Sequence, residues 1–372
     1  FFGGNDFAPK TFVEGKPIQD YLQEHYINAL AQVAGALKDL PNVIGFELMN
    51  EPSAGYIGIE DIEQPYHTDI MGDAPTPYQG MLLGDGIPQL VQGYRMGAVS
   101  LKKNGEKMLN PDKLSAWIDN RPGIWRENGV FRIKDDGTPE LIDAAYFSKV
   151  NEQKVDFNKM YYEPFAKKYA GAMLAINPDW IICVDNCLFP YPHGLPDLKN
   201  VGDIKWINGS HWYDDVTLVK KKYLPFLGLV DGKVIFGKRK VKKAFENFLA
   251  GMIGETHEKY GDVPSLLGEF GIPFDMNRSK AFRTGNYNKQ VRALDRSFAV
   301  AEANLLSYTL WNYTADNTYE RGDQWNGEDL SVFSLSQQAD PADINSGGRA
   351  LEAAVRPYPK KITGKLTDYK YN

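Results

Sequence analysis

The sequence has little cysteine, no excess of basic charge and no long apolar run. Only two of its 372 residues are cysteines, Cys183 and Cys187, which excludes a disulfide framework and predicts a reduced, buried pair. Acidic residues outnumber basic ones by 48 to 42, so the net charge of -6 provides no broad cationic surface for nucleic acid. No apolar run approaches the roughly 18 residues of a membrane-spanning helix. We therefore predict neither a nucleic-acid partner nor a membrane-spanning segment.

The composition is instead that of a globular chain with a large core, because 43% of its residues are hydrophobic and 13% are aromatic. A helical pattern precedes a short apolar run in four places: 17–40 before 43–49, 162–173 before 180–184, 245–253 before 265–268, and 291–301 before 305–311. A fifth run, 206–211, has no such helix directly before it. Helices between buried strands predict an α/β fold with a parallel sheet.

The first helix and strand carry the most detailed structural prediction. Pro17 suits the first turn of a helix. The run 43–49 is almost wholly apolar, which is typical of a strand buried on both faces. Apolar residues three or four positions apart predict the buried face of the helix, and they are Ile18, Leu22, Tyr26, Leu30, Val33 and Leu37.

Two long inserts interrupt this alternation. Residues 60–155 are rich in glycine, proline and aromatics and are far longer than an ordinary loop, so we expect them to form a cap or cleft wall above the strand ends. The second insert covers 215–240. Its basic cluster at 238–243 favours the solvated start of a helix over an anion-binding surface.

Two glutamates each follow one of the apolar runs. Glu51 lies in Asn50-Glu51-Pro52 after the first run, and Glu269 follows the run 265–268. A carboxylate at the end of a buried strand is costly to desolvate unless it is paired, so two of them suggest a functional cleft. Hydrolysis of a glycosidic bond uses two carboxyl groups: one protonates the leaving oxygen, and the other attacks the anomeric carbon or activates water. The alternative is a structural ion pair at each strand end.

The order of four motifs resembles glycoside hydrolase family 5, whose members are retaining (β/α)₈-barrel enzymes. The motifs are Asn50-Glu51-Pro52, His211-Trp212-Tyr213, Gly268-Glu269-Phe270-Gly271 and Trp311. Further stretches resemble the branch that contains endoglycoceramidases, fungal-type glucosylceramidases and steryl β-glucosidases. These stretches are 2–10, 18–22, 310–317 and 322–329, and the insert 60–155 is the least similar part.

The resemblance implies catalytic roles for three of the matched residues. Glu51 would be the general acid/base, and Glu269 would be the nucleophile that forms a glycosyl-enzyme. Asn50 would donate a hydrogen bond to the sugar 2-hydroxyl, a contact that strengthens in the transition state. The chemistry needs one carboxyl ionised and the other protonated, so their surroundings should differ.

The resemblance also implies a set of supporting residues. Tyr213 would hold the carboxylate of the nucleophile, His211 would line the same rim, and Trp311 would form an apolar platform under the sugar ring. A polar loop follows the last expected strand, and we expect sugar contacts there from Trp325, Asn326 and Glu328, with plain loop structure as the alternative.

The sequence predicts no metal and no other cofactor. Its five histidines do not have the spacing of a metal site, and the acidic stretch at 340–347 does not match a calcium loop. The expected partner is a carbohydrate or glycolipid substrate, with contact at a membrane surface. Neither a compartment nor an oligomeric state follows from the sequence.

The chain departs from the family at both ends. In the family the acid/base follows the fourth barrel strand, whereas only fifty residues precede Glu51 here. The expectation is therefore an incomplete (β/α)₈ barrel with strands four to eight in residues 1–355, followed by the start of a C-terminal β-sandwich in residues 356–372. Such a fragment would leave sheet edges unpaired, so we expect the polypeptide alone to be insoluble or inactive.

These observations together predict a retaining β-glycosidase that acts on a glucoside with a lipid or hydrophobic aglycone, such as glucosylceramide or a steryl glucoside. An endoglycoceramidase that releases a whole oligosaccharide is the nearest alternative. A β-glucanase or mannanase would need an open groove with several aromatic subsites. The alternative without catalysis is an inactive carbohydrate-binding fragment.

Overall fold

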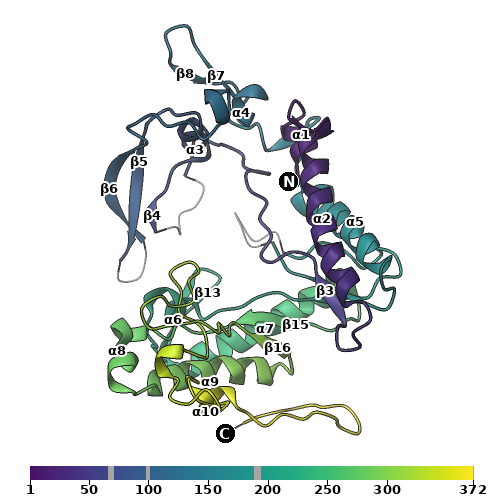
Figure 1. Cartoon of the computed structure of the whole chain (residues 1–372), viewed down its shortest axis with the longest axis vertical. Helices are drawn as coiled ribbons and strands as arrows, with labels where there is room; N and C mark the ends of the chain where they lie inside the picture. Colours follow the sequence, from purple (N-terminus) through teal and green to yellow (C-terminus); the bar gives the residue numbers. More distant parts are fainter. Residues whose placement is uncertain (66–70, 98–100, 188–193, 372) are drawn as a thin grey trace. The chain divides into compact units, whose positions relative to one another are not determined.

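The structure is a computed structural model that describes residues 1–65, 71–97, 101–187 and 194–371 (Figure 1). The chain forms two compact units, which are described separately. Unit 1 comprises Phe1–Trp180 and Cys187–Ile204, and unit 2 comprises Ile181–Asn186 and Lys205–Asn372. Unit 2 contains helices and parallel strands, and unit 1 contains helices and small antiparallel sheets. The chain therefore has an α/β fold. None of the helices in the described residues is long and apolar enough to cross a membrane.

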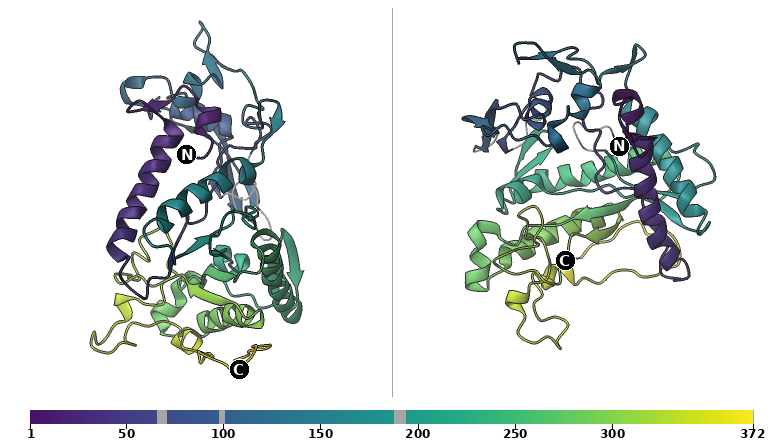
Figure 2. Two further views of the ribbon diagram at one scale, coloured as in Figure 1. Left: turned by 90° about the vertical axis from the view of Figure 1, so that its right-hand side faces the viewer. Right: turned by 45° about the horizontal axis from the view of Figure 1, so that its top comes forward.

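Two helices form the framework of unit 1. Helix α2 (Ile18–Leu37) packs beside α5 (Glu163–Leu174), as both views of Figure 2 show. The apolar face predicted for α5 is confirmed, because Phe165, Tyr169 and Met173 are each at most 1% exposed.

The buried face of α2 differs from the prediction. Val33 is 48% exposed and Leu22 37%, whereas Gln23, Ile27 and Ala34 are buried. The buried stripe is therefore rotated by about one residue. The cause is polar: the Gln23 side-chain amide donates to the carbonyl oxygen of Phe1 at 3.1 Å, so the N-terminal segment lies over this face. Pro17 is the N-cap residue of α2.

The insert 60–155 folds within unit 1 as a set of short elements dominated by antiparallel pairs. Strand β5 (Gln89–Met96) pairs with β4 (Gly72–Asp73) on one side and β6 (Leu101–Leu109) on the other. Helix α3 (Pro77–Gly84) begins at a capping box in which Thr76 and Gln79 satisfy each other's backbone N–H groups. The remaining elements of this insert are η1 (Ile118–Asn120), α4 (Ile124–Glu127), β7 (Phe131–Ile133), β8 (Pro139–Leu141), β9 (Lys149–Val150) and β10 (Gln153–Lys154).

Unit 2 contains the parallel strands that the sequence predicts. Strand β11 (Ile181–Val184) pairs in parallel with β12 (Trp206–Asn208), and β15 (Leu266–Phe270) pairs in parallel with β16 (Ser307–Leu310). Parallel bridges from Asn208 to Ser265 and from His211 to Glu269 join the two pairs. The strands therefore follow one another across unit 2 in chain order, as neighbours in a barrel wall do. No closed barrel is formed by the residues that the structure describes.

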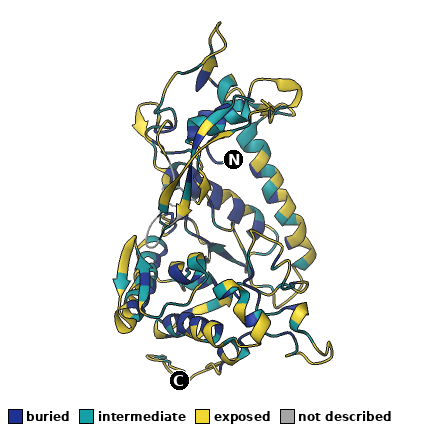
Figure 3. Ribbon diagram, turned by 90° about the vertical axis from the view of Figure 1, so that its left-hand side faces the viewer, coloured by how far each residue is buried: buried dark blue, intermediate teal, exposed yellow. Residues whose placement is uncertain are grey.

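Two long helices supply most of the core of unit 2. Helix α7 (Lys238–Tyr260) begins at the basic cluster, as predicted, and α9 (Asn288–Ala303) precedes β16. Their inward side chains include Phe245, Leu249 and Leu294, none of which is exposed. Figure 3 draws buried residues in dark blue. The second predicted insert becomes α6 (Asp215–Lys220) and the hairpin of β13 (Leu227–Val230) and β14 (Lys233–Phe236).

Smaller elements complete the two units. They are α1 (Gly4–Phe7), β1 (Phe12–Val13), β2 (Lys16–Pro17), β3 (Gly45–Glu47), η2 (Asn158–Tyr162), α8 (Met276–Thr284), η3 (Leu335–Gln337) and α10 (Leu351–Ala354). Both cysteines are reduced; Cys187 is fully buried, as predicted, whereas Cys183 is half-buried. The described residues beyond α10 carry no helix or strand, so the predicted β-sandwich at 356–372 stays a prediction.

Candidate active site

Glu269 is fixed by the sheet of unit 2. It lies inside β15, near the carboxyl end of that strand, so the predicted strand 265–268 ended too early. The Trp212 N–H donates to the carbonyl oxygen of Glu269 at 3.0 Å, and the Trp311 N–H donates to that of Phe270 at 2.9 Å. Because neighbouring chains hold the backbone from both sides, the direction of the Glu269 side chain is set by the sheet.

The two glycines around Glu269 allow the backbones to approach closely. A Cβ atom at Gly268 would collide with the carbonyl oxygen of Gly209, and one at Gly271 would collide with that of Trp311. These collisions involve backbone atoms, which cannot move aside as a flexible side chain can. Close backbone packing therefore requires glycine at both ends of the Gly-Glu-Phe-Gly motif, in addition to any chemical role of Glu269.

Two predicted rim residues reach the carboxylate of Glu269. The Tyr213 hydroxyl donates a hydrogen bond to Oε1. On the other side, Nδ1 of His211 lies 3.4 Å from Oε2. Both contacts are local to unit 2, so one structural unit brings together three residues that the sequence predicts at one site.

Asp185, which was not predicted from the sequence, lies on the other side of His211. Its Oδ2 is 3.6 Å from Nε2 of His211, and its side chain is fully buried. Asp185 directly follows β11, so the signal that singled out Glu51 and Glu269, a carboxylate after an apolar run, was present here too. Asp185 is placed to orient the imidazole that lies beside Glu269.

The loop after β16 brings further predicted residues together. Burial raises the pKa of Glu328 above its ordinary value, hydrogen bonds from the side chains of Trp311 and Asn326 oppose this rise, and the charges of Asp323 and Glu269 add to it. Trp311, Asn326 and Glu328 therefore form one polar cluster within electrostatic reach of Glu269.

Trp325 occupies a different position in the same loop. Its side chain is 62% exposed, although its carbonyl oxygen accepts a hydrogen bond from the N–H of Glu328 at 2.8 Å. The backbone of Trp325 therefore helps to shape the turn that carries Glu328. Its indole is open to solvent rather than packed in the core.

A buried ionic network holds this loop in place. Arg349 is completely buried, and its Nη2 lies 2.6 Å from Oδ1 of Asp329. The Asn317 side-chain amide donates to Asp323 at 2.7 Å and to Asp329 at 3.0 Å. Asp329 directly follows Glu328, so the network fixes the backbone from which Glu328 extends.

Asn50 and Glu51 belong to unit 1 and have a different setting. The preceding strand β3 ends at Glu47, so Glu51 does not follow a strand directly as predicted. Nor is this strand buried on both faces, because Glu47 is exposed. Glu51 is half-buried and has a φ of 41°, in the left-handed region that residues other than glycine rarely adopt. Such backbone conformations concentrate at functional sites.

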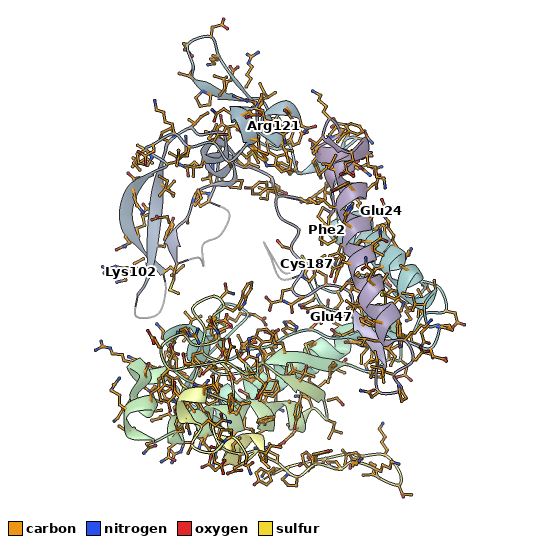
Figure 4. The ribbon with its side chains drawn as sticks, viewed as in Figure 1. Phe2, Glu24, Glu47, Lys102, Arg121 and Cys187 are labelled. Atoms are coloured by element: carbon orange, nitrogen blue, oxygen red, sulfur yellow. The ribbon has the colours of Figure 1, made fainter. Side chains whose placement is uncertain are left out.

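Three side-chain donors hold the backbone that leads to Glu51. The Trp180 indole donates to the carbonyl oxygen of Val43 at 3.1 Å. The Tyr169 hydroxyl donates to that of Glu47, and the Tyr26 hydroxyl to that of Leu48, each at 2.8 Å. Figure 4 labels Glu47 at the lower end of α2. These contacts fix the segment from α2, α5 and the residue before β11.

Neither unit taken alone provides a three-residue metal site. Among the described residues of each unit, no three side chains of histidine, cysteine, aspartate or glutamate bring ligand atoms close enough to share an ion. The chemistry that the described geometry offers is that of carboxyl, phenol, imidazole and amide groups.

Comparison with known proteins gives related sequences along the whole chain. No family model matches it. The chain is 34% identical over 402 residues to a glucosylceramidase of Rhizopus delemar, an alignment that covers 100% of this chain and 58% of that protein. It is 30% identical over 384 residues to an ergosteryl-beta-glucosidase of Saccharomyces cerevisiae, covering 90% of this chain and 49% of that one. The chain thus spans about half the length of these curated relatives.

A solved structure shares the fold. The crystal structure of Cryptococcus neoformans sterylglucosidase 1 superposes with a TM-score of 0.86 at 29% sequence identity, and the match covers 96% of this chain and 57% of that one. A match of this extent includes both units.

Proposed function

We propose that this chain carries the catalytic residues of a retaining β-glycosidase that hydrolyses a β-glucoside with a lipid or hydrophobic aglycone. The observation that carries the proposal is Glu269, which receives a hydrogen bond from Tyr213 and lies beside His211 and the Glu328 cluster. The names of the relatives, glucosylceramidase and ergosteryl-beta-glucosidase, support the substrate class.

Glu269 is the nucleophile in this proposal. A carboxylate that accepts a hydrogen bond from a phenol is stabilised in its ionised form, the state needed for attack on the anomeric carbon. His211 and Tyr213 contact different oxygens of the carboxylate, so they restrict its rotation. A fixed orientation lowers the entropic cost of reaching the transition state.

Glu51 is the general acid/base. It protonates the glycosidic oxygen as the aglycone leaves and then removes a proton from the water that hydrolyses the glycosyl-enzyme. Asn50, the adjacent residue, donates a hydrogen bond to the sugar 2-hydroxyl.

The loop after β16 binds the sugar. Trp311 provides the apolar platform for the sugar ring. Asn326 and Glu328 form hydrogen bonds with the hydroxyl groups of the sugar. The side chains of Trp311 and Asn326 both form hydrogen bonds with Glu328, which supports a shared role. Trp325, whose indole is exposed, contacts the substrate at the outer edge of this loop.

The architecture in this proposal is an incomplete (β/α)₈ barrel of glycoside hydrolase family 5, with residues 1–355 as the catalytic domain and 60–155 as its cap. Four parallel strands in chain order in unit 2 support a barrel wall. On this proposal they are strands five to eight, and β3 is the fourth.

Product analysis with the full-length protein tests the proposal. The protein should release glucose from glucosylceramide or a steryl glucoside, and Glu269→Gln should abolish release while substrate still binds. Release of an intact oligosaccharide from a ganglioside would instead identify an endoglycoceramidase. Unchanged hydrolysis by the Glu269→Gln variant would reject the assignment.

A further inference from the structure

Unit 1 contains an apolar pocket that the catalytic assignment does not use. Its volume of about 400 Å³ lies in the range of small-molecule sites, about 300–1,000 Å³. It lies between the N-terminal segment, α2, residues 53–57 and the insert 60–155. Figure 4 labels Phe2 beside α2, at one wall of this pocket. The lining residues outside the N-terminal segment are Ile18, Leu22, Ser53, Ala54, Gly55, Tyr56, Ile57, Ile124, Trp125 and Phe147.

Part of the pocket wall lies close in the sequence to the candidate acid/base. Ser53, Ala54 and Gly55 line it and follow Glu51 almost directly. A second pocket of about 360 Å³ shares Ser53, Gly55 and Tyr56 with the first and extends to the start of α3. The segment after Glu51 therefore borders two pockets.

Packed aromatic rings form the wall of the pocket. The ring of Phe147 lies 5.0 Å from that of Trp125 and 5.5 Å from that of Tyr56, measured between centroids. The Gly58 N–H donates to the carbonyl oxygen of Phe147 at 2.8 Å, which joins the cap to the segment after Glu51. The pocket is thus preformed, so a ligand does not have to order its wall.

The chemistry of the lining selects the kind of ligand. None of the described residues that line the first pocket carries an acidic or basic side chain, and aromatic and aliphatic groups dominate. A sugar would lose the hydrogen bonds that its hydroxyl groups make with water and regain few of them here. A hydrocarbon would gain from leaving water.

We propose that this pocket binds the hydrocarbon aglycone of the lipid glucoside; this inference rests on the proposed function. An acid that protonates the leaving oxygen must contact the aglycone side of the scissile bond. The aglycone site must therefore adjoin Glu51. Two pockets border Ser53 and Gly55, and we assign the aglycone to the first because its described lining has no charged side chain, whereas Asp73 lines the second. A sterol and a ceramide share the hydrocarbon chemistry that it requires.

The first test places a charge at an exposed edge of the pocket. Leu22 lines the pocket from α2 and is 37% exposed, so Leu22→Lys should leave folding intact. Val33→Lys is the matched control, because Val33 lies on the same helix, is 48% exposed and does not line the pocket. The measured quantity is kcat/KM of the full-length protein for a steryl glucoside or glucosylceramide, divided by kcat/KM for a water-soluble aryl glucoside. Leu22→Lys should lower this ratio by about tenfold.

The second test measures binding without turnover. In the full-length protein carrying Glu269→Gln, a fluorescent sterol and a fluorescent ceramide are titrated, and the tighter ligand identifies the aglycone class. Trp125→Ala should weaken the tighter ligand about tenfold or more. Its melting temperature is measured in parallel, and Leu22→Lys provides the same readout if Trp125→Ala does not fold.

The outcomes separate the two proposals. If the unmutated protein hydrolyses no β-glucoside, the proposed function fails. If it hydrolyses lipid and soluble glucosides but Leu22→Lys leaves their ratio at the Val33→Lys value, the pocket assignment alone is overturned. Binding of neither lipid probe would also overturn the pocket assignment.

Discussion

The two candidate carboxylates are held by different means. In unit 2, neighbouring backbone segments hold Glu269 from both sides, and two side chains contact its carboxylate. In unit 1, the segment that leads to Glu51 is held by side chains of Tyr26, Tyr169 and Trp180, which donate to its carbonyl oxygens. In a sheet, backbone hydrogen bonds hold the residue, and substitution of one side chain does not remove them. The segment before Glu51 is held by three side-chain hydrogen bonds, each of which a single substitution can remove.

This difference agrees with the proposed roles of Glu269 as nucleophile and Glu51 as acid/base. A nucleophile must attack along one line and gains from a rigid support. An acid/base must serve two steps, first donating a proton to the aglycone oxygen and later accepting one from water.

Glu51→Gln should affect substrates according to their leaving groups. Loss of the acid/base should lower kcat/KM about 10²–10⁴-fold for a lipid glucoside, whose alkoxide leaves poorly, and less for an aryl glucoside with an acidic phenol. The measurement is kcat/KM of the full-length protein across a series of aryl glucosides. Glu63→Gln, an exposed carboxylate of unit 1, is the control and should show no such dependence. A loss equal for all leaving groups would contradict the acid/base role.

Arg349→Met should destabilise unit 2 more than any single hydrogen-bond deletion in unit 1. It leaves the carboxylate of Asp329 buried without its cation, which typically costs about 3–5 kcal/mol. Urea denaturation measures the free energy of unfolding. Arg321→Met removes an exposed arginine from the same loop and should change stability by less than about 0.5 kcal/mol. Equal effects of the two substitutions would show that the buried pair contributes little.

Tyr169→Phe should have a smaller effect in unit 1. The phenylalanine keeps the packing of a fully buried ring but removes the donor to the carbonyl oxygen of Glu47. We expect the free energy of unfolding to fall by about 1–3 kcal/mol. We also expect a lower kcat for substrates that need protonation by Glu51, and no change in the initial burst of aglycone that accompanies attack by Glu269. Tyr358→Phe, at a hydroxyl on a largely exposed side chain, is the control.

The parallel part of the fold was predictable because its periodicity is local. Helices α5, α7 and α9 each show their buried face in the sequence, and the strands that follow them are short and apolar. The elements within the insert 60–155 were not predictable, since its short antiparallel pairs depend on contacts that the local pattern does not show. The face of α2 was misplaced for a related reason: a hydrogen bond from Gln23 to the N-terminal segment buries a polar side chain, which a hydrophobic pattern does not reveal.

The contacts around Glu269 follow the sequence motifs closely, because strand ends in a parallel sheet meet at one edge. The motifs could not reveal how the loop after β16 is held. Arg349 comes from a stretch without a recognisable pattern, and its pairing with Asp329 spans 20 residues of irregular chain. The same limit applies to the apolar pocket, whose walls come from five separate segments.

The smallest effect that we predict concerns the pH dependence of stability. Burial raises the pKa of Glu328 above its ordinary value of 4.5, so the folded state holds this proton to higher pH than the unfolded state does. Stability should therefore be unaffected by this group below about pH 4.5 and should fall as pH rises through the raised pKa. Glu328→Gln removes this dependence, so the melting temperature of the variant minus that of the unmutated protein should increase with pH and then level off. Glu320→Gln, at an exposed site in the same loop, should give a difference that does not change with pH. A difference that decreases with pH would mean that Glu328 is stabilised as an anion. The loop after β16 would then resemble the rigid support of Glu269 rather than contrast with it.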